Sequence, residues 1–240
     1  MVAASGTAVG TVLITGASRG LGLEFVRQYG SDGWEVIACA REPERATSLK
    51  SIAAESDGRV ALHALDVTEH SAIDALAKKL DGRAIDVLIN CAGAMGARGS
   101  SFGASDYAEW DALFRLNTFA PMKMPEAFVT HVARSEQKKI VSLSTLMASM
   151  ARNTLGGFYA YRASKAALNA LTVSMALDLG RRHGIVAAVI HPGWVRTDMG
   201  GPRAEIDAPT SVTGMRSVIA GLTRERAGRF WSYDGSELPW

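Results

Sequence analysis

The sequence predicts an α/β fold built on a doubly wound parallel sheet of about seven strands, with helices on both faces. Three observations predict it. Short runs of Val, Ile and Leu alternate with longer helical patterns, and these runs lack the polar alternation of a sheet with one face in water. A glycine-rich turn follows the first run directly. The length, 240 residues, gives between one and two domains at about 150 residues each, and single α/β domains of this length are common, so it suits a single Rossmann-type domain over residues 1–240.

The elements follow in strand–helix order. The expected strands are residues 11–15, 34–40, 59–65, 85–90, 139–144, 184–190 and 228–231. The expected helices are residues 20–29, 44–55, 71–80, 158–183 and 211–222. Right-handed crossovers then place helices on both faces of the sheet. Residues 106–131 are also expected to be helical, but Pro121 and Pro125 lie inside them, and interior prolines kink or break helices, so the shape of this segment stays open.

Two segments are irregular and follow predicted strands. Residues 92–105 are rich in Gly and Ser, and residues 191–209 contain three prolines. Ligands of open α/β sheets bind beyond the carboxyl ends of the strands. We therefore expect these two loops to select the substrate.

Composition and charge exclude several function classes. The formal net charge of +2 removes the main sequence argument for binding nucleic acid or an anionic membrane. No apolar run approaches the ~20 residues that span a bilayer, and the first residues show no secretory pattern. Cys39 and Cys91 are expected to be reduced thiols, and the five histidines show no ligand spacing. We expect a cytoplasmic protein with no metal, nucleic acid or membrane partner.

The glycine-rich turn TGASRGLG at 15–22 permits two chemistries. Its glycines allow a pyrophosphate to approach the backbone and a helix N-terminus, although the spacing G-x-x-x-G-x-G differs from the fingerprint G-x-G-x-x-G. The same turn contains G-x-S-x-G, the nucleophile elbow of an α/β-hydrolase, with Ser18 as nucleophile and His191 as a partner. Gly22 favours the nucleotide, because it suits close helix packing and has no purpose in an elbow. A tight turn without a ligand is the third alternative.

The end of the second strand indicates the form of the nucleotide. An NAD site places an acidic residue there to bind the ribose hydroxyl, but this chain has Ala40 followed by Arg41. Arg41 and Arg19 are suited to clamp a 2′-phosphate. Either arginine alone is also typical of a solvated surface. Together they predict NADP(H) in preference to NAD(H).

Tyr161 and Lys165 lie four positions apart at the start of a long helical pattern, so they share one helix face. A phenol, with a pKa of about 10, is a weak acid–base catalyst near neutral pH. A neighbouring ammonium lowers that pKa, and a shift of about three units takes roughly 4 kcal/mol. Such a pair is also common on exposed helices, so its meaning depends on the other motifs.

In combination, these motifs resemble those of the short-chain dehydrogenase/reductase family, in its branch of about 250 residues. The turn at 15–22 resembles the family's T-G-x-x-x-G-x-G cofactor turn. NCAG at 90–93 resembles N-N-A-G, with Cys91 in place of the second Asn, and PGWVRT at 192–197 resembles the loop that contacts nicotinamide. Asp66 and Val67 resemble the adenine contact. The resemblance covers nearly the whole chain.

The resemblance implies a mechanism. NADPH delivers a hydride to a carbonyl carbon, Tyr161 protonates the oxygen, and Lys165 binds the ribose and lowers the tyrosine pKa. Asn117 connects Lys165 to solvent through water. The residues implied to bind NADP(H) are Gly16, Ser18, Arg19, Gly20, Leu21, Gly22, Arg41, Asp66, Val67, Asn90, Ala92, Gly93, Tyr161, Lys165, Pro192, Gly193, Val195 and Thr197.

One catalytic position departs from the family pattern. The family's strand ends in two serines, of which the second is catalytic, whereas IVSLST at 140–145 places Thr145 there. A threonine hydroxyl still hydrogen-bonds a carbonyl, but its methyl group narrows the site. Ser144 is the fallback, although strand alternation directs it away from the face of Thr145. The interval from Thr145 to Tyr161 is also longer than is usual in the family.

This longer interval, with GGFYAY at 156–161, resembles the C-factor-like branch of the family. We expect reversible, NADPH-dependent reduction of a small ketone or aldehyde by a homodimer or homotetramer. The alternative is an NADP(H)-binding regulatory or signalling protein of the C-factor type with little turnover. A halohydrin dehalogenase is disfavoured, because the cofactor glycines and Lys165 are kept. The apolar residues expected to contact substrate are Met95, Met147, Phe158 and Trp194.

Overall fold

The computed structural model of the protein describes residues 9–97 and 102–240, and its centre is one parallel sheet. The strands are β1 (Thr11–Thr15), β2 (Glu35–Ala40), β3 (Val60–Ala64), β4 (Val87–Asn90), β5 (Lys139–Leu143), β6 (Val186–His191) and β7 (Phe230–Ser232). They lie in the order β3-β2-β1-β4-β5-β6-β7. The predicted Rossmann-type α/β fold is confirmed, and every predicted strand is present.

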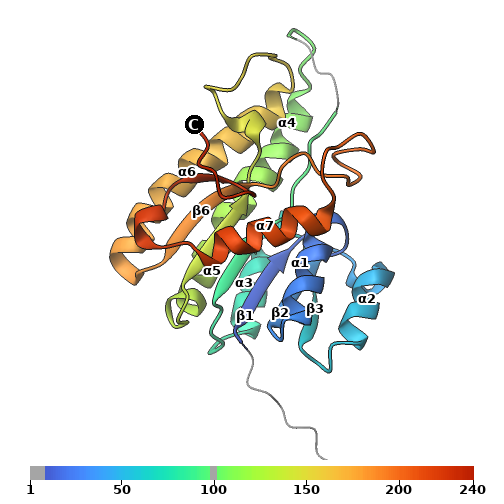
Figure 1. Ribbon diagram of the computed structural model, residues 1–240, viewed down its shortest axis with the longest axis vertical. Helices are drawn as coiled ribbons and strands as arrows, with labels where there is room; N and C mark the ends of the chain where they lie inside the picture. The colour runs from blue at the N-terminus through green and yellow to red at the C-terminus, as the bar shows by residue number, and fades with distance from the viewer. Residues whose placement is uncertain (1–8, 98–101) are drawn as a thin grey trace, which may run out of the picture.

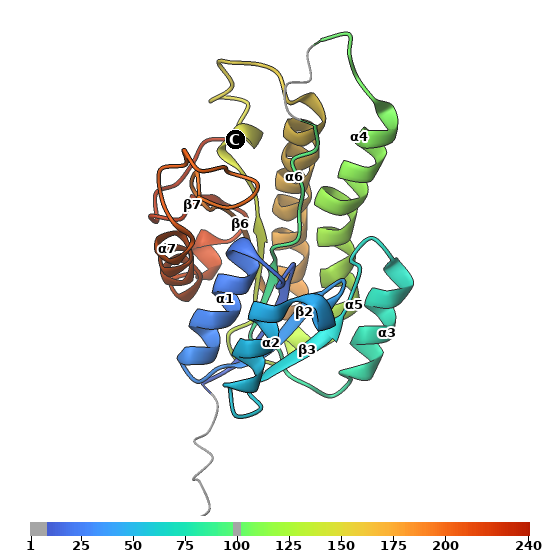
Figure 2. The same cartoon turned by 90° about the vertical axis from the view of Figure 1, so that its right-hand side faces the viewer.

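Helices cover both faces of the sheet (Figures 1 and 2). They are α1 (Gly20–Ser31), α2 (Thr47–Ala54), α3 (His70–Lys79), α4 (Tyr107–Phe114), α5 (Ala120–Ala133), α6 (Tyr159–His183) and α7 (Ala208–Ala220). On one face Phe25 of α1 and Met215 of α7 belong to a buried cluster with strand residues. On the other face Ile73 of α3 and Phe128 of α5 belong to a second cluster. Because both faces are covered, the strands need no polar alternation.

Two predicted helix starts were wrong by three residues. α2 begins at Thr47 and not at residue 44, because Pro43–Arg45 form a separate 3₁₀ turn. α7 begins at Ala208 and not at residue 211. Its second residue is Pro209, which a first helical turn tolerates, and the Asp207 side chain accepts the Thr210 N–H as a cap.

The segment that contains Pro121 and Pro125 is one continuous helical run. α4 passes through a π-helical turn, Arg115–Phe119, into α5. In a regular α-helix the ring of Pro121 would clash with the Asn117 carbonyl, and the π turn just before it widens the helix there. Pro125 has no N–H for the Pro121 carbonyl. The Asn90 amide donates to that carbonyl instead, at 3.2 Å.

The loops at the carboxyl ends of the strands gather beyond one edge of the sheet (Figure 2). β1 and β4 are neighbours at the point where the strand order reverses. The loops that follow them touch, since a Cβ built on Gly16 would lie 2.9 Å from the Ala92 Cα. Residues 98–101 of the predicted loop 92–105 lie outside the described residues. This edge therefore offers the geometry in which open α/β sheets bind ligands.

Residues 9–97 and 102–240 contain neither a candidate membrane span nor a cluster of metal ligands. No helix there combines the length and the apolar character needed to cross a bilayer. No group of three or more His, Cys, Asp or Glu side chains there is arranged to hold a metal ion. Cys39 and Cys91 are both free thiols.

Asn90→Ala is expected to lower the free energy of unfolding by about 1–3 kcal/mol, because the buried Pro121 carbonyl loses its donor. Pro125→Ala supplies an N–H to the same carbonyl. The cost of Asn90→Ala is therefore expected to be about 1 kcal/mol smaller in the Pro125→Ala background. Urea unfolding of the four chains measures this coupling. An equal cost in both backgrounds would show that Asn90 does not replace the missing helical donor.

Candidate active site

A cavity of about 410 Å³ lies at the carboxyl edge of the sheet, beside the reversal of strand order. The predicted cofactor residues that line it are Gly16, Ser18, Arg19, Gly20, Leu21, Gly22, Arg41, Asp66, Val67, Ala92, Gly93 and Thr197. The lining residues that were not among the predicted cofactor contacts are Ala40, Leu65, Thr68, Cys91, Ala94, Leu116, Asp198 and Met199. Several of these end or directly follow a strand, so the rule that ligands bind at carboxyl ends could have identified them.

The glycine turn brings the start of α1 close to the cavity. Gly16 and Gly20 have φ of +69° and +55°, in the left-handed region that favours glycine. A Cβ on Gly22 would clash with the Gly16 carbonyl oxygen, so only glycine permits this close turn. No side chain caps the N-terminus of α1, whose first residues line the cavity. Its first backbone N–H groups are therefore suited to hold an anion.

Thr15 is a positioning residue that we did not predict. Its hydroxyl oxygen accepts the N–H groups of Cys91 at 3.0 Å and Ala92 at 3.1 Å. These bonds join the end of β1 to the segment after β4. They fix the two walls of the cavity relative to each other.

The hydrolase alternative lacks its required geometry. A nucleophile elbow holds its serine in a strained turn, but Ser18 has no positive φ. No described hydrogen bond joins Ser18 to His191. The Nδ1 atom of His191 is buried without a hydrogen-bond partner among the described residues. Burial lowers the pKa of His191 to about 4, against the opposing charge of Asp234.

The two predicted phosphate arginines differ in their partners. Arg19 forms an ion pair of 2.9 Å with Asp198, and both side chains are more than 70% exposed. The exposed Arg41 has no ion pair within the described residues and lines the cavity beside Asp66. Burial raises the pKa of Asp66, but hydrogen bonds from Thr68 and the charge of Arg41 outweigh it and lower that pKa. Arg41 is therefore the arginine that is free to meet an anion.

Tyr161 and Thr145 form a hydroxyl pair. Tyr161 lies in the first turn of α6 and is buried, and its phenol shares a hydrogen bond with the Thr145 side chain. Burial raises the pKa of Tyr161, and the hydrogen bond with Thr145 opposes this rise. Ser144 points elsewhere, because its hydroxyl donates to Asn169 Oδ1 at 2.6 Å. Of the two hydroxyls considered for the substrate-orienting role, the structure places Thr145 at Tyr161.

Lys165 and Asn117 flank the segment after β4. Lys165 is buried, and its ammonium donates to the Leu143 carbonyl at 2.8 Å. Burial lowers its pKa to about 8, against an opposing effect of Cys91. The fully buried Asn117 exchanges two hydrogen bonds with the backbone of Ala94, at 2.8 and 3.0 Å. A Cβ on Gly93 would lie 3.2 Å from Asn117 Oδ1 and 3.4 Å from Lys165 Nζ, so both side chains meet at this glycine.

The loop after β6 folds over the glycine turn. A Cβ on Gly20 would lie 3.6 Å from the Thr197 methyl group. Gly193 has φ of +84°, and a Cβ there would lie 2.7 Å from Ile206. Val195 is buried and pairs with Ile206 in a β-bridge. Pro192, Gly193 and Val195 thus shape the loop from outside the cavity, while Thr197 lines it.

The predicted substrate residues lie on three segments around Tyr161. Met95, Met147 and Phe158 are half-buried. Trp194 is 48% exposed, and its indole N–H donates to the Gly200 carbonyl at 2.9 Å. None of the four lines the cavity of the glycine turn. Any contact with substrate therefore takes place outside the nucleotide part of the site.

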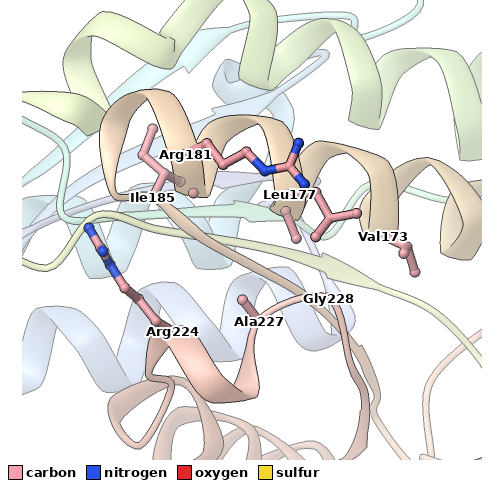
Figure 3. A pocket seen from close by; sticks show the side chains of 9 residues that line it. Val173, Leu177, Arg181, Ile185, Arg224, Ala227 and Gly228 are labelled. Carbon is pink, nitrogen blue, oxygen red and sulfur yellow. The ribbon is translucent and has the colours of Figure 1, made fainter.

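A second hollow of about 510 Å³ lies at the end of α6 (Figure 3). It is lined by Val173, Ala176, Leu177, Gly180, Arg181, Ile185, Arg224, Ala227 and Gly228. Ile185 directly precedes β6, so this hollow lies at the amino edge of the sheet, opposite the glycine turn. It holds none of the predicted site residues.

Comparison with known proteins agrees with this geometry. The family model of short chain dehydrogenases matches residues 10–207. C-signal of Myxococcus xanthus is 46% identical over 156 residues, which is 65% of this chain and 93% of C-signal. Carbonyl reductase Sniffer of D. melanogaster superposes with a TM-score of 0.90 at 31% identity, over 96% of this chain and 99% of Sniffer.

A cofactor-bound structure is also similar. The NADPH-bound carbonyl reductase from chicken fatty liver superposes with a TM-score of 0.89 at 32% identity, over 97% of this chain and all (100%) of that one. Sequence, fold and the order of the site motifs thus agree. The chain belongs to the short-chain dehydrogenase/reductase family of oxidoreductases.

Proposed function

We propose that this protein reduces a small ketone or aldehyde to an alcohol, reversibly, with NADPH as the hydride donor. The observation that carries the proposal is that Tyr161, with Thr145 beside it, is buried in the first turn of α6, four residues before the buried Lys165. This pair stands next to Lys165 on α6, whose ammonium approaches Gly93 of the nucleotide cavity. A proton donor and a cofactor site are the two components that carbonyl reduction needs.

The residues present fit a dinucleotide. The glycines of the turn leave room that any Cβ would fill, and the uncapped start of α1 suits a pyrophosphate. Asp66, Val67 and Ala92 line the same cavity, where an adenosine would lie between the loops of β3 and β4. When bound, reduced nicotinamide supplies a hydride to the carbonyl carbon.

The side chains of this chain supply the proton. The raised pKa of Tyr161 keeps its phenol protonated near neutral pH, which is the form required to protonate the substrate oxygen during reduction. Thr145 orients that oxygen with its hydroxyl. For the reverse reaction Tyr161 must lose its proton, and positive charge beside it favours that form.

Lys165 and Asn117 are proposed to return the proton to Tyr161. The ammonium of Lys165 is anchored to the Leu143 carbonyl, and its pKa of about 8 lets it exchange protons near neutral pH. Asn117 lies at the π turn before Pro121, which cannot donate to the Asn117 carbonyl. That carbonyl is suited to hold a water molecule between Lys165 and solvent.

The proposed preference for NADPH rests on Arg41. It is exposed, lines the cavity and follows the end of β2, where an NAD site would carry a carboxylate. Arg19 contributes less, because a phosphate must first displace Asp198 from it.

The substrate is proposed to contact an apolar rim. Met147 and Phe158 come from the connection between β5 and α6, and Trp194 comes from the loop 191–209. In this proposal the whole chain is one NADP(H)-binding domain, and the loops 92–105 and 191–209 choose the substrate.

The protein is proposed to act in the cytoplasm as a homodimer or homotetramer. Exposed apolar side chains lie on the outer helices, with Phe119 51% and Leu177 55% exposed. Exposed apolar groups of this kind are compatible with contact between subunits.

A second candidate is a regulatory or signalling protein that binds NADP(H) with little turnover. The identity of 46% with C-signal favours it. NADPH oxidation with a panel of ketones, aldehydes and diketones separates the two candidates. Binding of NADPH without turnover across this panel would favour the second.

Tyr161→Phe is expected to lower kcat about 10²–10⁴-fold, because the proton donor is lost. The dissociation constant for NADPH, measured by fluorescence titration, is expected to stay within about twofold, since the glycine turn is untouched. Tyr159→Phe is the matched control, because that side chain lies near the site and is 37% exposed. Wild-type kcat in Tyr161→Phe would rule out the proposed acid.

Arg41→Ala is expected to weaken NADPH binding about 10–100-fold through the loss of charge-assisted hydrogen bonds, with NADH binding unchanged. Arg45→Ala is the control, because Arg45 is exposed nearby and already paired with Glu42 at 3.1 Å. Titration of each variant with both cofactors measures the ratio. A parallel loss for NADPH and NADH would contradict recognition of the 2′-phosphate by Arg41.

Lys165→Met tests the buried ammonium through stability. The folded pKa of Lys165, about 8, lies below the unfolded value of about 10.4, so wild type gains stability from this residue as pH rises through that window. Between pH 8 and pH 10, the difference in the free energy of unfolding between wild type and Lys165→Met is expected to increase by roughly 2–3 kcal/mol in favour of wild type. Lys50→Met, at a half-exposed lysine, is expected to show no such gain. Urea unfolding across this pH range tests it, and parallel curves would exclude a lowered pKa.

A further inference from the structure

We propose that Arg162 is a positioning residue that holds Thr145 against Tyr161 by bracing the connection 144–158 at both ends; this inference rests on the proposed function. Arg162 directly follows Tyr161 on α6. Its Nη1 donates to the Met147 carbonyl at 2.9 Å, and its Nε donates to the Gly157 carbonyl at 3.1 Å. One guanidinium therefore joins the start and the end of the long connection.

The two hydrogen bonds from the Arg162 side chain form a brace across the connection 144–158. At the start of the connection, this brace fixes the hydroxyl of Thr145, which is proposed to orient the substrate. The Met147 N–H donates to Thr145 Oγ1 at 3.2 Å, while the Met147 carbonyl accepts from Arg162. Met147 is thus held on both sides, by Thr145 and by α6. Because Tyr161 lies on the same helix, this chain of bonds sets the distance between the Thr145 and Tyr161 hydroxyls. A small misplacement of catalytic groups lowers the reaction rate by a large factor.

At the end of the connection, the brace holds a strained turn. Gly156, Gly157 and Phe158 all have positive φ, of +65°, +65° and +52°. The left-handed region is unfavourable for Phe158, which carries a Cβ, so its neighbours must hold it there. Arg162 does so in two ways, since its backbone N–H donates to the Phe158 carbonyl at 2.9 Å and its side chain holds Gly157. Phe158, an expected substrate contact, is presented by this turn.

The chemistry of arginine suits this task. Its planar guanidinium carries donors in a fixed fork, whereas lysine presents one compact charge. Within the described parts of the chain no carboxylate pairs with Arg162. Its side-chain hydrogen bonds go to the two backbone carbonyls. The guanidinium therefore acts on the shape of the connection and not on a surface ion pair.

The test compares Arg162→Met, Arg162→Lys and the control Arg181→Met. Arg181 lies on the same helix, is exposed, and borders the hollow at the opposite edge of the sheet (Figure 3). Arg162→Met is expected to lower kcat about 10–100-fold with the dissociation constant for NADPH within about twofold of wild type. The kcat of Arg162→Lys is expected to lie between those of wild type and Arg162→Met, because lysine can reach one of the two carbonyls. A kcat for Arg162→Met equal to that of Arg181→Met would overturn the proposal.

The pH profile separates positioning from general damage. The hydrogen bond with Thr145 lowers the pKa of Tyr161, so its loss is expected to move the pH midpoint of kcat upward in Arg162→Met. A merely structural defect would lower the amount of active enzyme and leave the midpoint in place. A reduced kcat with an unmoved midpoint would therefore also overturn the proposal.

Limited proteolysis keeps the brace and the proposed function distinguishable. Arg152 is an exposed trypsin site inside the connection. Cleavage after Arg152 is expected to be several-fold faster in Arg162→Met than in wild type or Arg181→Met. If wild type turns over no carbonyl compound but cleavage still accelerates, the proposed function is wrong and the brace stands. Unchanged cleavage would show that Arg162 does not hold the connection.

Discussion

The reversal of strand order between β1 and β4 is the constraint on which the rest of the site depends. Two neighbouring parallel strands send their following chains in opposite directions, which leaves a crevice at their carboxyl ends. Thr15 joins the two walls by accepting the N–H groups of Cys91 and Ala92. The contact of Gly16 with Ala92 leaves no room for a side chain. The start of α1 and Gly93 are thereby brought to one cavity.

Burial then decides the electrostatics of the proposed reaction centre. Tyr161 and Lys165 lie on α6 against the carboxyl end of β5, where little water reaches them. Burial disfavours the charged form of each group, so the pKa of the phenol rises and that of the ammonium falls. The two pKa values, which are nearly equal for the free side chains, thus move apart. This favours a protonated acid beside a base that can exchange its proton near neutral pH.

The sequence was most informative where one local pattern has one physical solution. Uninterrupted apolar runs require strands covered on both faces, and all of them are strands of the sheet. Closely spaced glycines require a tight turn, and Gly16, Gly20 and Gly22 form it. The sequence also predicted, from strand alternation, that Ser144 turns away from the face of Thr145, and in the structure the Ser144 hydroxyl donates to Asn169. It could not rank Arg19 and Arg41, because the ion pair with Asp198 joins positions far apart in the sequence.

By itself, the sequence determined the positions of the strands along the chain, the glycine turn and the four-residue spacing of Tyr161 and Lys165. These features depend only on neighbours along the chain. Only the tertiary structure decided the path of the helix around Pro121 and Pro125. Its outcome depends on the Asn90 amide, which a distant strand supplies to an unpaired carbonyl. The same holds for Thr145 and Arg162, whose partners meet only when the connection between β5 and α6 folds back onto the helix.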